Sequence, residues 1–308
     1  MTHAVETRAK AEFDTEIRQS NAPMTADEMS QALQDFDAVI PSLGDAFSPA
    51  VFDAAGDIRC KLLANFGVGY NHIDVNAAKA AGVAVTNTPG AVTDATADIA
   101  MTLLLMSARR AAEGERLVRS GQWEGWHPTQ MLGLHVTGKH VGIVGLGRIG
   151  EAIARRCHFG FGMTVSYIAR SEKSPGFPVQ RIQSVAAMAA EVDFLVIAVP
   201  GGAETRHLVD ANVLAAMKPT GHLVNIARGE VVDEEALISA LETGALGGAG
   251  LDVYEFEPEV PARLRGLENV TLLPHLGTAA EEVRSAMGHM ALDNVSAQQD
   301  GRPLPNPV

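Results

Sequence analysis

The chain has 308 residues, of which 46% are hydrophobic and 20% charged, so it can bury a core and wholesale disorder is excluded. This length suits two domains of roughly 100–200 residues each. Lysine and arginine number 24 against 37 aspartates and glutamates, which gives a formal net charge of −13. Such an acidic surface repels nucleic-acid phosphates and anionic lipids, so nucleic acid and membrane are poor candidates as partners.

The number of cysteines and the length of the apolar runs indicate the cellular compartment. The two cysteines, Cys60 and Cys157, are too few for a disulfide framework and lack the spacing of a zinc site, so we expect reduced thiols and no metal. The first residues show no basic segment followed by an apolar one, and the longest apolar run is far shorter than the ~20 residues of a membrane span. We therefore expect a soluble, cytoplasmic protein.

Short apolar runs that end in turn residues predict strands at residues 38–40, 61–64, 83–85, 140–144, 164–167, 194–199, 222–226, 249–253 and 270–273. Amphipathic stretches between them predict helices at residues 98–120, 150–159, 184–190, 210–217 and 234–243. Strands that alternate with helices predict an α/β fold with mostly parallel sheets. The chain departs from this pattern at its start, because residues 5–13 read as a helix with no strand before them.

A glycine-rich turn joins the predicted strand at residues 140–144 to the next helix. In this GxGxxG motif, Gly145 permits a tight turn, Gly147 lets the backbone approach a pyrophosphate, and Gly150 allows the helix to pack closely on the strand. The N–H groups and positive dipole end of the following helix favour an anion. The motif therefore predicts a dinucleotide site, with a glycine-rich turn that binds no ligand as the alternative.

The end of the next strand bears on which dinucleotide binds. NAD-binding proteins usually carry Asp or Glu about 20 residues after the glycines, where it accepts hydrogen bonds from the ribose. Here Ile168 takes that place, followed by Ala169, Arg170 and Ser171. A guanidinium and a hydroxyl can receive a 2′-phosphate, so we expect NADP(H) to be preferred and NAD(H) to be possible. A solvated Arg170 without a ligand is the alternative.

Three later motifs each follow a predicted strand, where open α/β sheets bind ligands. They contain Arg228, Glu257 and His275. Arg228 can clamp a carboxylate through two hydrogen bonds. Glu257 and His275 can form a hydrogen-bonded pair, and a buried carboxylate would keep the histidine protonated near neutrality, as a proton donor requires.

The glycine-rich turn, Asn225-Ile226-Ala227-Arg228-Gly229, Gly250-Leu251-Asp252-Val253 with Glu257-Pro258, and Pro274-His275 together resemble the D-isomer-specific 2-hydroxyacid dehydrogenase family. The resemblance runs from about Leu33 onward and is closest to the glyoxylate/hydroxypyruvate reductases and their hydroxyphenylpyruvate-reducing relatives. It implies NAD(P)H-dependent reduction of glyoxylate or hydroxypyruvate to the D-2-hydroxy acid.

The resemblance also implies residue roles. Arg228 would bind the substrate carboxylate and polarise its carbonyl, His275 would donate the proton, and Glu257 would orient and charge His275. The backbone N–H groups of Val68 and Gly69 would grip the substrate carboxylate. The implied cofactor contacts are Asp252 at the nicotinamide carboxamide, Arg148 and Ile149 along the pyrophosphate, and Ala227 and Gly277 in the same motifs.

The family architecture implies two Rossmann or flavodoxin-like domains with parallel sheets and an active site in the cleft between them. The substrate domain would comprise residues 1–97 completed by residues 284–308, and the dinucleotide domain residues 98–283. The family dimerises through the dinucleotide domain, so we expect a homodimer. The apolar stripe of Ile99, Leu103, Leu104 and Met106 is then buried core or, in our interpretation, dimer interface. Residues 123–131 would contact the partner subunit or form a plain surface loop.

Other functions remain open at this stage. Hydroxyphenylpyruvate reductases and phosphite dehydrogenases share the arginine, glutamate and histidine set, whereas formate dehydrogenases generally carry glutamine in place of Glu257. Dinucleotide-sensing corepressors have the same fold but typically carry extra tails. These alternatives require substrate assays to separate them.

Overall fold

The computed structural model describes residues 1–308, which form two compact units. Unit 1 comprises Met1–Val92 with Thr278–Val308, and unit 2 comprises Thr93–Gly277. The predicted boundaries lie a few residues later, inside the helices α5 (Thr93–Ala108) and α12 (Glu281–Gln299). The observed boundaries between the units precede both helices, because each helix packs as one rigid element within a single unit.

Unit 1 is built on a small parallel sheet of strand order β1-β2-β3. Its strands are β1 (Ala38–Val39), β2 (Leu62–Ala64) and β3 (Ala84–Thr86), and its helices besides α12 are α1 (His3–Glu12), α2 (Ala26–Asp35), α3 (Pro49–Ala55) and α4 (Val75–Ala80). Thr25 and Glu28 form a reciprocal capping box at the start of α2, which satisfies N–H groups of its first turn. The largest core of this unit lies among α2, α3, α4 and the sheet.

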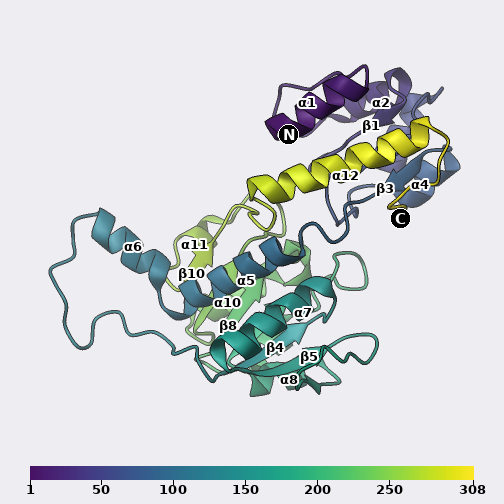
Figure 1. The fold of residues 1–308 in the computed structure, drawn as a ribbon. Coiled ribbons are helices and arrows are strands. Elements are labelled where there is room, and N and C mark those ends of the chain that lie inside the picture. Colours follow the sequence, from purple (N-terminus) through teal and green to yellow (C-terminus); the bar gives the residue numbers. More distant parts are fainter. The chain divides into compact units, whose positions relative to one another are not determined.

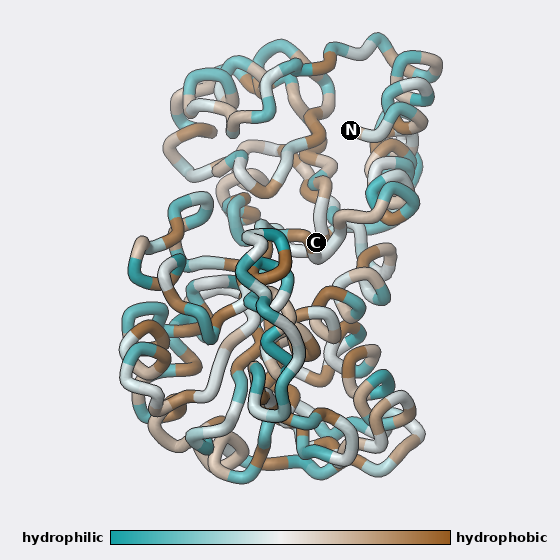
Figure 2. The backbone as a smooth tube through the Cα atoms, turned by 90° about the vertical axis from the view of Figure 1, so that its left-hand side faces the viewer, coloured by the Kyte–Doolittle hydropathy of each residue, from teal (hydrophilic) through white to brown (hydrophobic).

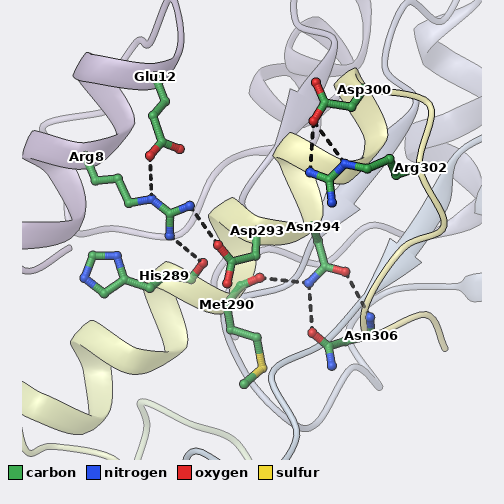
Figure 3. A network of polar contacts seen from close by, with 9 residues as sticks. All are labelled: Arg8, Glu12, His289, Met290, Asp293, Asn294, Asp300, Arg302 and Asn306. Carbon is green, nitrogen blue, oxygen red and sulfur yellow. Dashed lines mark hydrogen bonds and ion pairs between the residues drawn. The ribbon is translucent and has the colours of Figure 1, made fainter.

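The predicted opening helix is present as α1, which packs against α12. Val5 is fully buried, and a Cβ added at Gly288 of α12 would lie 2.5 Å from its side chain, so glycine is needed for this close approach. Arg8 extends the contact by donating to Asp293 and to the carbonyl of His289 (Figure 3). Farther along α12, Asn294 bonds Asn306 of the C-terminal tail, which fixes the end of the chain to unit 1.

Unit 2 contains a seven-stranded parallel sheet of order β10-β9-β8-β7-β4-β5-β6 (Figure 1). The strands are β4 (His140–Val144), β5 (Thr164–Ile168), β6 (Gln180–Arg181), β7 (Phe194–Ile197), β8 (His222–Asn225), β9 (Gly248–Leu251) and β10 (Val270–Leu272). The fold prediction is therefore confirmed, and every strand predicted from the sequence is present. The sequence missed β6 because it is short and exposed and has no apolar run.

Helices cover both faces of this sheet and bury a separate apolar cluster on each. The helices are α5, α6 (Ala111–Arg119), α7 (Arg148–Arg155), α8 (Val185–Glu191), α9 (Ala211–Ala216), α10 (Glu234–Glu242) and the short α11 (Ala262–Arg265), with a π-helical turn at Arg156–Gly160 and a 3-10 turn at Gly229–Val231. Figure 2 shows hydrophobic stretches alternating with hydrophilic ones along the chain, as amphipathic packing requires. None of the helices is long and apolar enough to cross a membrane.

Two expectations for the first helices of unit 2 are wrong. The single helix predicted at residues 98–120 is divided into α5 and α6 at Arg110, whose φ of 53° lies in the left-handed region. Leu103 and Leu104 are fully buried in the core of unit 2, so the interface prediction is wrong for these two residues, whereas Ile99 and Met106 of the same stripe are partly exposed. Leu103 packs so closely on β9 that a Cβ at Gly250 would lie 2.8 Å from it.

Candidate active site

The candidate catalytic residues of unit 2 follow the carboxyl ends of neighbouring parallel strands. Arg228 follows β8, Asp252 and Glu257 follow β9, and His275 follows β10. Because parallel strands end at the same edge of the sheet, these four side chains project from one region of unit 2. The structure thereby brings together the residues that the sequence predicts.

The central contact is a hydrogen bond of 2.8 Å between His275 Nδ1 and Glu257 Oε2. The other carboxylate oxygen, Oε1, accepts the backbone N–H of Tyr254 at 3.0 Å. A histidine bonded to a carboxylate through Nδ1 presents Nε2 as the nitrogen that can donate to a substrate. The pair is only about one-third exposed, so it is partly shielded from solvent and remains accessible.

The pKa of Glu257 reflects several opposing effects. Burial acts to raise this pKa, but the hydrogen bond and charge of His275, the N–H of Tyr254 and the charge of Arg228 lower it below its ordinary value. Glu257 is therefore ionised at neutral pH. An ionised carboxylate can only accept, so Nδ1 of His275 is the donor in this hydrogen bond.

Arg228 is held by the turn that follows β8. The buried Asn225 accepts the N–H of Ala227 at 3.0 Å and donates to the carbonyl of Arg228 at 2.9 Å. Gly229 lies against the backbone of Tyr254, where an added Cβ would be 1.8 Å from the carbonyl carbon. Burial lowers the pKa of Arg228, against the charges of Glu257 and Glu230, but a guanidinium remains charged at any working pH.

Asp252 connects the ends of β9 and β10. Its buried carboxylate accepts the N–H groups of Leu276 at 2.6 Å and Gly277 at 2.8 Å, and its carbonyl accepts the N–H of His275 at 2.9 Å. Burial raises the pKa of Asp252, and these two N–H donors act to lower it. The structure thus places Asp252 as the anchor of the segment that carries His275.

The glycine-rich turn has the geometry that a pyrophosphate requires. Gly145 has φ 99°, and a Cβ at Gly150 would lie 2.0 Å from the carbonyl oxygen of Gly145, so both positions need glycine. At Gly147 an added Cβ meets nothing within 4 Å. Arg148 and Ile149 begin α7, and their N–H groups donate to no acceptor in the chain. The turn therefore offers open space and unpaired donors, and it fits a dinucleotide.

The segment beyond β5 contains an ion pair that the sequence did not reveal. Ile168 ends β5, and Ala169, Arg170 and Ser171 follow it, as predicted. Arg170 donates to Glu204 at 2.7 Å, and both side chains are more than four-fifths exposed. The two residues are far apart in the chain, so no local pattern could have shown the pair.

Val68 and Gly69 lie in unit 1, in the loop that follows β2. Both residues are partly exposed. Their backbone N–H groups donate to no backbone carbonyl. Two adjacent, outward N–H groups are suited to bind an anionic oxygen.

Comparison with known proteins identifies the family. The sequence profile described as "D-isomer specific 2-hydroxyacid dehydrogenase, NAD binding domain" matches residues 101–277. The chain belongs to the D-isomer specific 2-hydroxyacid dehydrogenase family. It is therefore an oxidoreductase, and unit 2 contains its nicotinamide-dinucleotide-binding domain.

Individual relatives cover almost the whole chain. A glyoxylate reductase of Thermococcus kodakarensis is 43% identical over 97% of this chain and 91% of its own length. A hydroxyphenylpyruvate reductase of Plectranthus scutellarioides is 44% identical over 81% of this chain and 79% of its own. A solved NADPH-dependent glyoxylate/hydroxypyruvate reductase of Sinorhizobium meliloti, in complex with NADP and malonate, has a TM-score of 0.89 at 38% identity, over 100% of this chain and 94% of that one. These comparisons support NAD(P)H-dependent reduction of a 2-oxo acid.

Proposed function

We propose that this family member reduces glyoxylate or hydroxypyruvate to the corresponding D-2-hydroxy acid, with NADPH as the preferred reductant. The observation that carries the proposal is the His275–Glu257 pair beside Arg228 at one edge of the unit 2 sheet. The glyoxylate reductases and the NADPH-dependent reductase among the relatives support the choice of substrate and cofactor.

When bound in unit 2, a nicotinamide dinucleotide would supply the hydride that reduces the carbonyl carbon of the 2-oxo acid. His275 donates a proton from Nε2 to the carbonyl oxygen, while Glu257 holds the imidazole at Nδ1 and balances its charge. Arg228 binds the carboxylate and stabilises the negative charge that develops on the oxygen. Val68 and Gly69 bind the carboxylate through their backbone N–H groups.

The residues we propose to hold the cofactor come from five segments of unit 2. They are Gly145, Gly147, Arg148, Ile149 and Gly150 at the pyrophosphate, Ala169, Arg170 and Ser171 at the 2′-phosphate, and Ala227, Asp252 and Gly277 near the nicotinamide. Arg170 is exposed and paired only with Glu204. An exposed ion pair contributes about 0–1 kcal/mol, so a 2′-phosphate can replace Glu204 at low cost.

We also propose a homodimer formed through unit 2. Figure 1 shows α6 and the segment after it extending away from the rest of unit 2. α6 has no buried residue, and the exposed fractions of Trp126 and Leu132 in this arm are 79% and 68%. Large apolar side chains on a projecting segment are typical of an interface with another chain. Sedimentation velocity of the wild type and of Trp126→Ser tests this: we expect a dimer and a shift toward monomer, and a monomeric wild type contradicts the proposal.

Initial rates with NADPH and NADH test the catalytic proposal, using glyoxylate, hydroxypyruvate and hydroxyphenylpyruvate in turn. We expect a higher kcat/KM with NADPH and with the two small substrates. Hydroxyphenylpyruvate reduction is the second candidate, because of the 44% identical reductase of that substrate. Equal rates with NADH would reject the cofactor preference alone, and no turnover with bound dinucleotide would reject the proposed reaction.

A further inference from the structure

The loop of Val68 and Gly69 has an arrangement that the proposed reaction does not by itself explain. Its three consecutive carbonyl oxygens, on residues 67–69, all accept hydrogen bonds from elsewhere in unit 1. Asn65 Nδ2 donates to the carbonyls of Gly67 and Gly69, each at 3.0 Å. Asn87 Nδ2 donates to the carbonyl of Val68 at 2.9 Å.

A trans peptide is planar, so the C=O of one residue and the N–H of the next point in opposite directions. Fixing the Gly67 carbonyl therefore fixes the direction of the Val68 N–H, and fixing the Val68 carbonyl fixes that of the Gly69 N–H. With these carbonyls bound to asparagine amides, the two N–H groups point away from those amides. This is the orientation that an external anion requires.

The two asparagines are not equivalent. Asn65 is fully buried, and it shares the Gly67 carbonyl with a second donor, the N–H of Thr88 at 3.0 Å. Asn87 is partly exposed and donates to the Val68 carbonyl, and no backbone N–H shares that carbonyl with it. Loss of Asn87 therefore frees the peptide that presents the Gly69 N–H, whereas loss of Asn65 leaves the Val68 N–H partly held.

Building on the proposed function, we infer that Asn65 and Asn87 are positioning residues that hold the loop in the form that binds the substrate carboxylate. Asn87 fixes the direction of the Gly69 N–H by holding the Val68 carbonyl. Asn65 holds the carbonyls of Gly67 and Gly69, on either side of Val68. Neither residue takes part in hydride or proton transfer. Their effect is on carboxylate affinity and therefore on which anions the enzyme accepts.

The Asn87→Ala variant provides the main test, because a partly exposed side chain can be removed without opening the core. We expect its KM for glyoxylate and its inhibition constant for oxamate to rise about tenfold, the effect of one hydrogen bond to an ionised group. The KM for NADPH should change less than about twofold. A merely structural defect would raise both KM values and lower the melting temperature together.

Asn76→Ala is the matched control, since Asn76 is an exposed asparagine on α4 of the same unit. It should leave all of these constants unchanged. Asn65→Asp is the second variant: its carboxylate would face two carbonyl oxygens, and we expect weaker oxamate binding than in wild type. The rise in melting temperature produced by oxamate in the presence of NADPH reports this binding without turnover.

The outcomes separate the two proposals. A wild type that neither reduces glyoxylate nor is stabilised by oxamate overturns the proposed function, and this inference with it. An active wild type with an Asn87→Ala variant that is folded and has unchanged glyoxylate and oxamate constants overturns this inference alone. If Asn65→Asp does not fold, Asn87→Ala still decides the result.

Discussion

His275 Nδ1 lies 2.8 Å from Glu257 Oε2. The backbone of His275 is unusual, since its φ of 55° lies in the left-handed region. A left-handed conformation at a non-glycine residue costs about 1–3 kcal/mol and persists only where the surroundings hold it. Here Asp252 supplies that support, because its carbonyl and its carboxylate bind three successive N–H groups, from His275 to Gly277. The position of His275, the proposed proton donor, thus depends on the buried Asp252.

This pair predicts the pH dependence of both reaction directions. The lowered pKa of Glu257 keeps its carboxylate ionised until the pH falls through that lowered value, so the pair stays intact in mildly acidic solution. Reduction consumes a proton, so it should be steady at mildly acidic pH and slow as the solution becomes alkaline. Oxidation of the hydroxy acid should rise over the same range.

His275→Gln should lose about 10²–10⁴ in kcat, as expected for removal of a general acid, and should lose the pH dependence. The KM for NADPH should stay close to wild type, because His275 makes no proposed contact with the adenosine or phosphates. The measurement is kcat for glyoxylate reduction from pH 5 to pH 9. A wild-type profile that is flat across this range contradicts the role of His275.

Two glycines of the dinucleotide turn should respond differently to the same substitution. Gly147→Ala adds a methyl group into open space at a φ of −85°, so the protein should fold normally, but the methyl group would obstruct the pyrophosphate. Gly150→Ala forces the methyl group against the carbonyl of Gly145, so folding itself should suffer. Melting temperatures and NADPH dissociation constants distinguish the two. The idea fails if Gly147→Ala binds NADPH as tightly as wild type.

Arg170 should determine the preference between the two dinucleotides. Arg170→Ala should raise the KM for NADPH about 10–100-fold, since a charged hydrogen bond contributes roughly 1.5–3 kcal/mol, with little change for NADH. Glu204→Gln should lower the KM for NADPH, because it removes the carboxylate that competes with the 2′-phosphate. Arg302→Ala, which removes another exposed arginine paired with an aspartate, is the control. Equal effects on NADPH and NADH would show that Arg170 does not contact the 2′-phosphate.

The sequence could predict which residues gather at this edge of the sheet because they lie in short motifs directly after apolar strands. Arg228, Glu257 and His275 each follow a strand that pairs with the next, so a parallel sheet necessarily gathers them. The strands themselves were clear because each is an almost continuous apolar run bounded by turn residues.

What the sequence did not predict depends on contacts between distant segments or on a single backbone angle. Arg110 carries no local signal for φ 53°, so one amphipathic pattern concealed two helices. Leu103 has the same spacing in a core as in an interface, and only its packing on β9 decides between them. Asn65 and Asn87 look like ordinary loop residues until their carbonyl partners are known.

His222 has no role in the proposed reaction, but it should make the folding stability depend on pH. It is 7% exposed, lies 2.7 Å from the hydroxyl of Ser107 and stacks on Phe194. Burial lowers its pKa to about 4, whereas an unfolded histidine titrates near ~6.5. Between these values the unfolded chain binds a proton that the folded chain does not. The free energy of unfolding therefore falls as the pH drops from ~6.5 to ~4, by on the order of 3 kcal/mol.

Urea unfolding at pH 4.5, 5.5 and 6.5 measures this dependence. His222→Asn should flatten it, whereas His127→Asn, at an exposed position, should retain it. Equal slopes in wild type and His222→Asn would show that other groups cause the loss of stability.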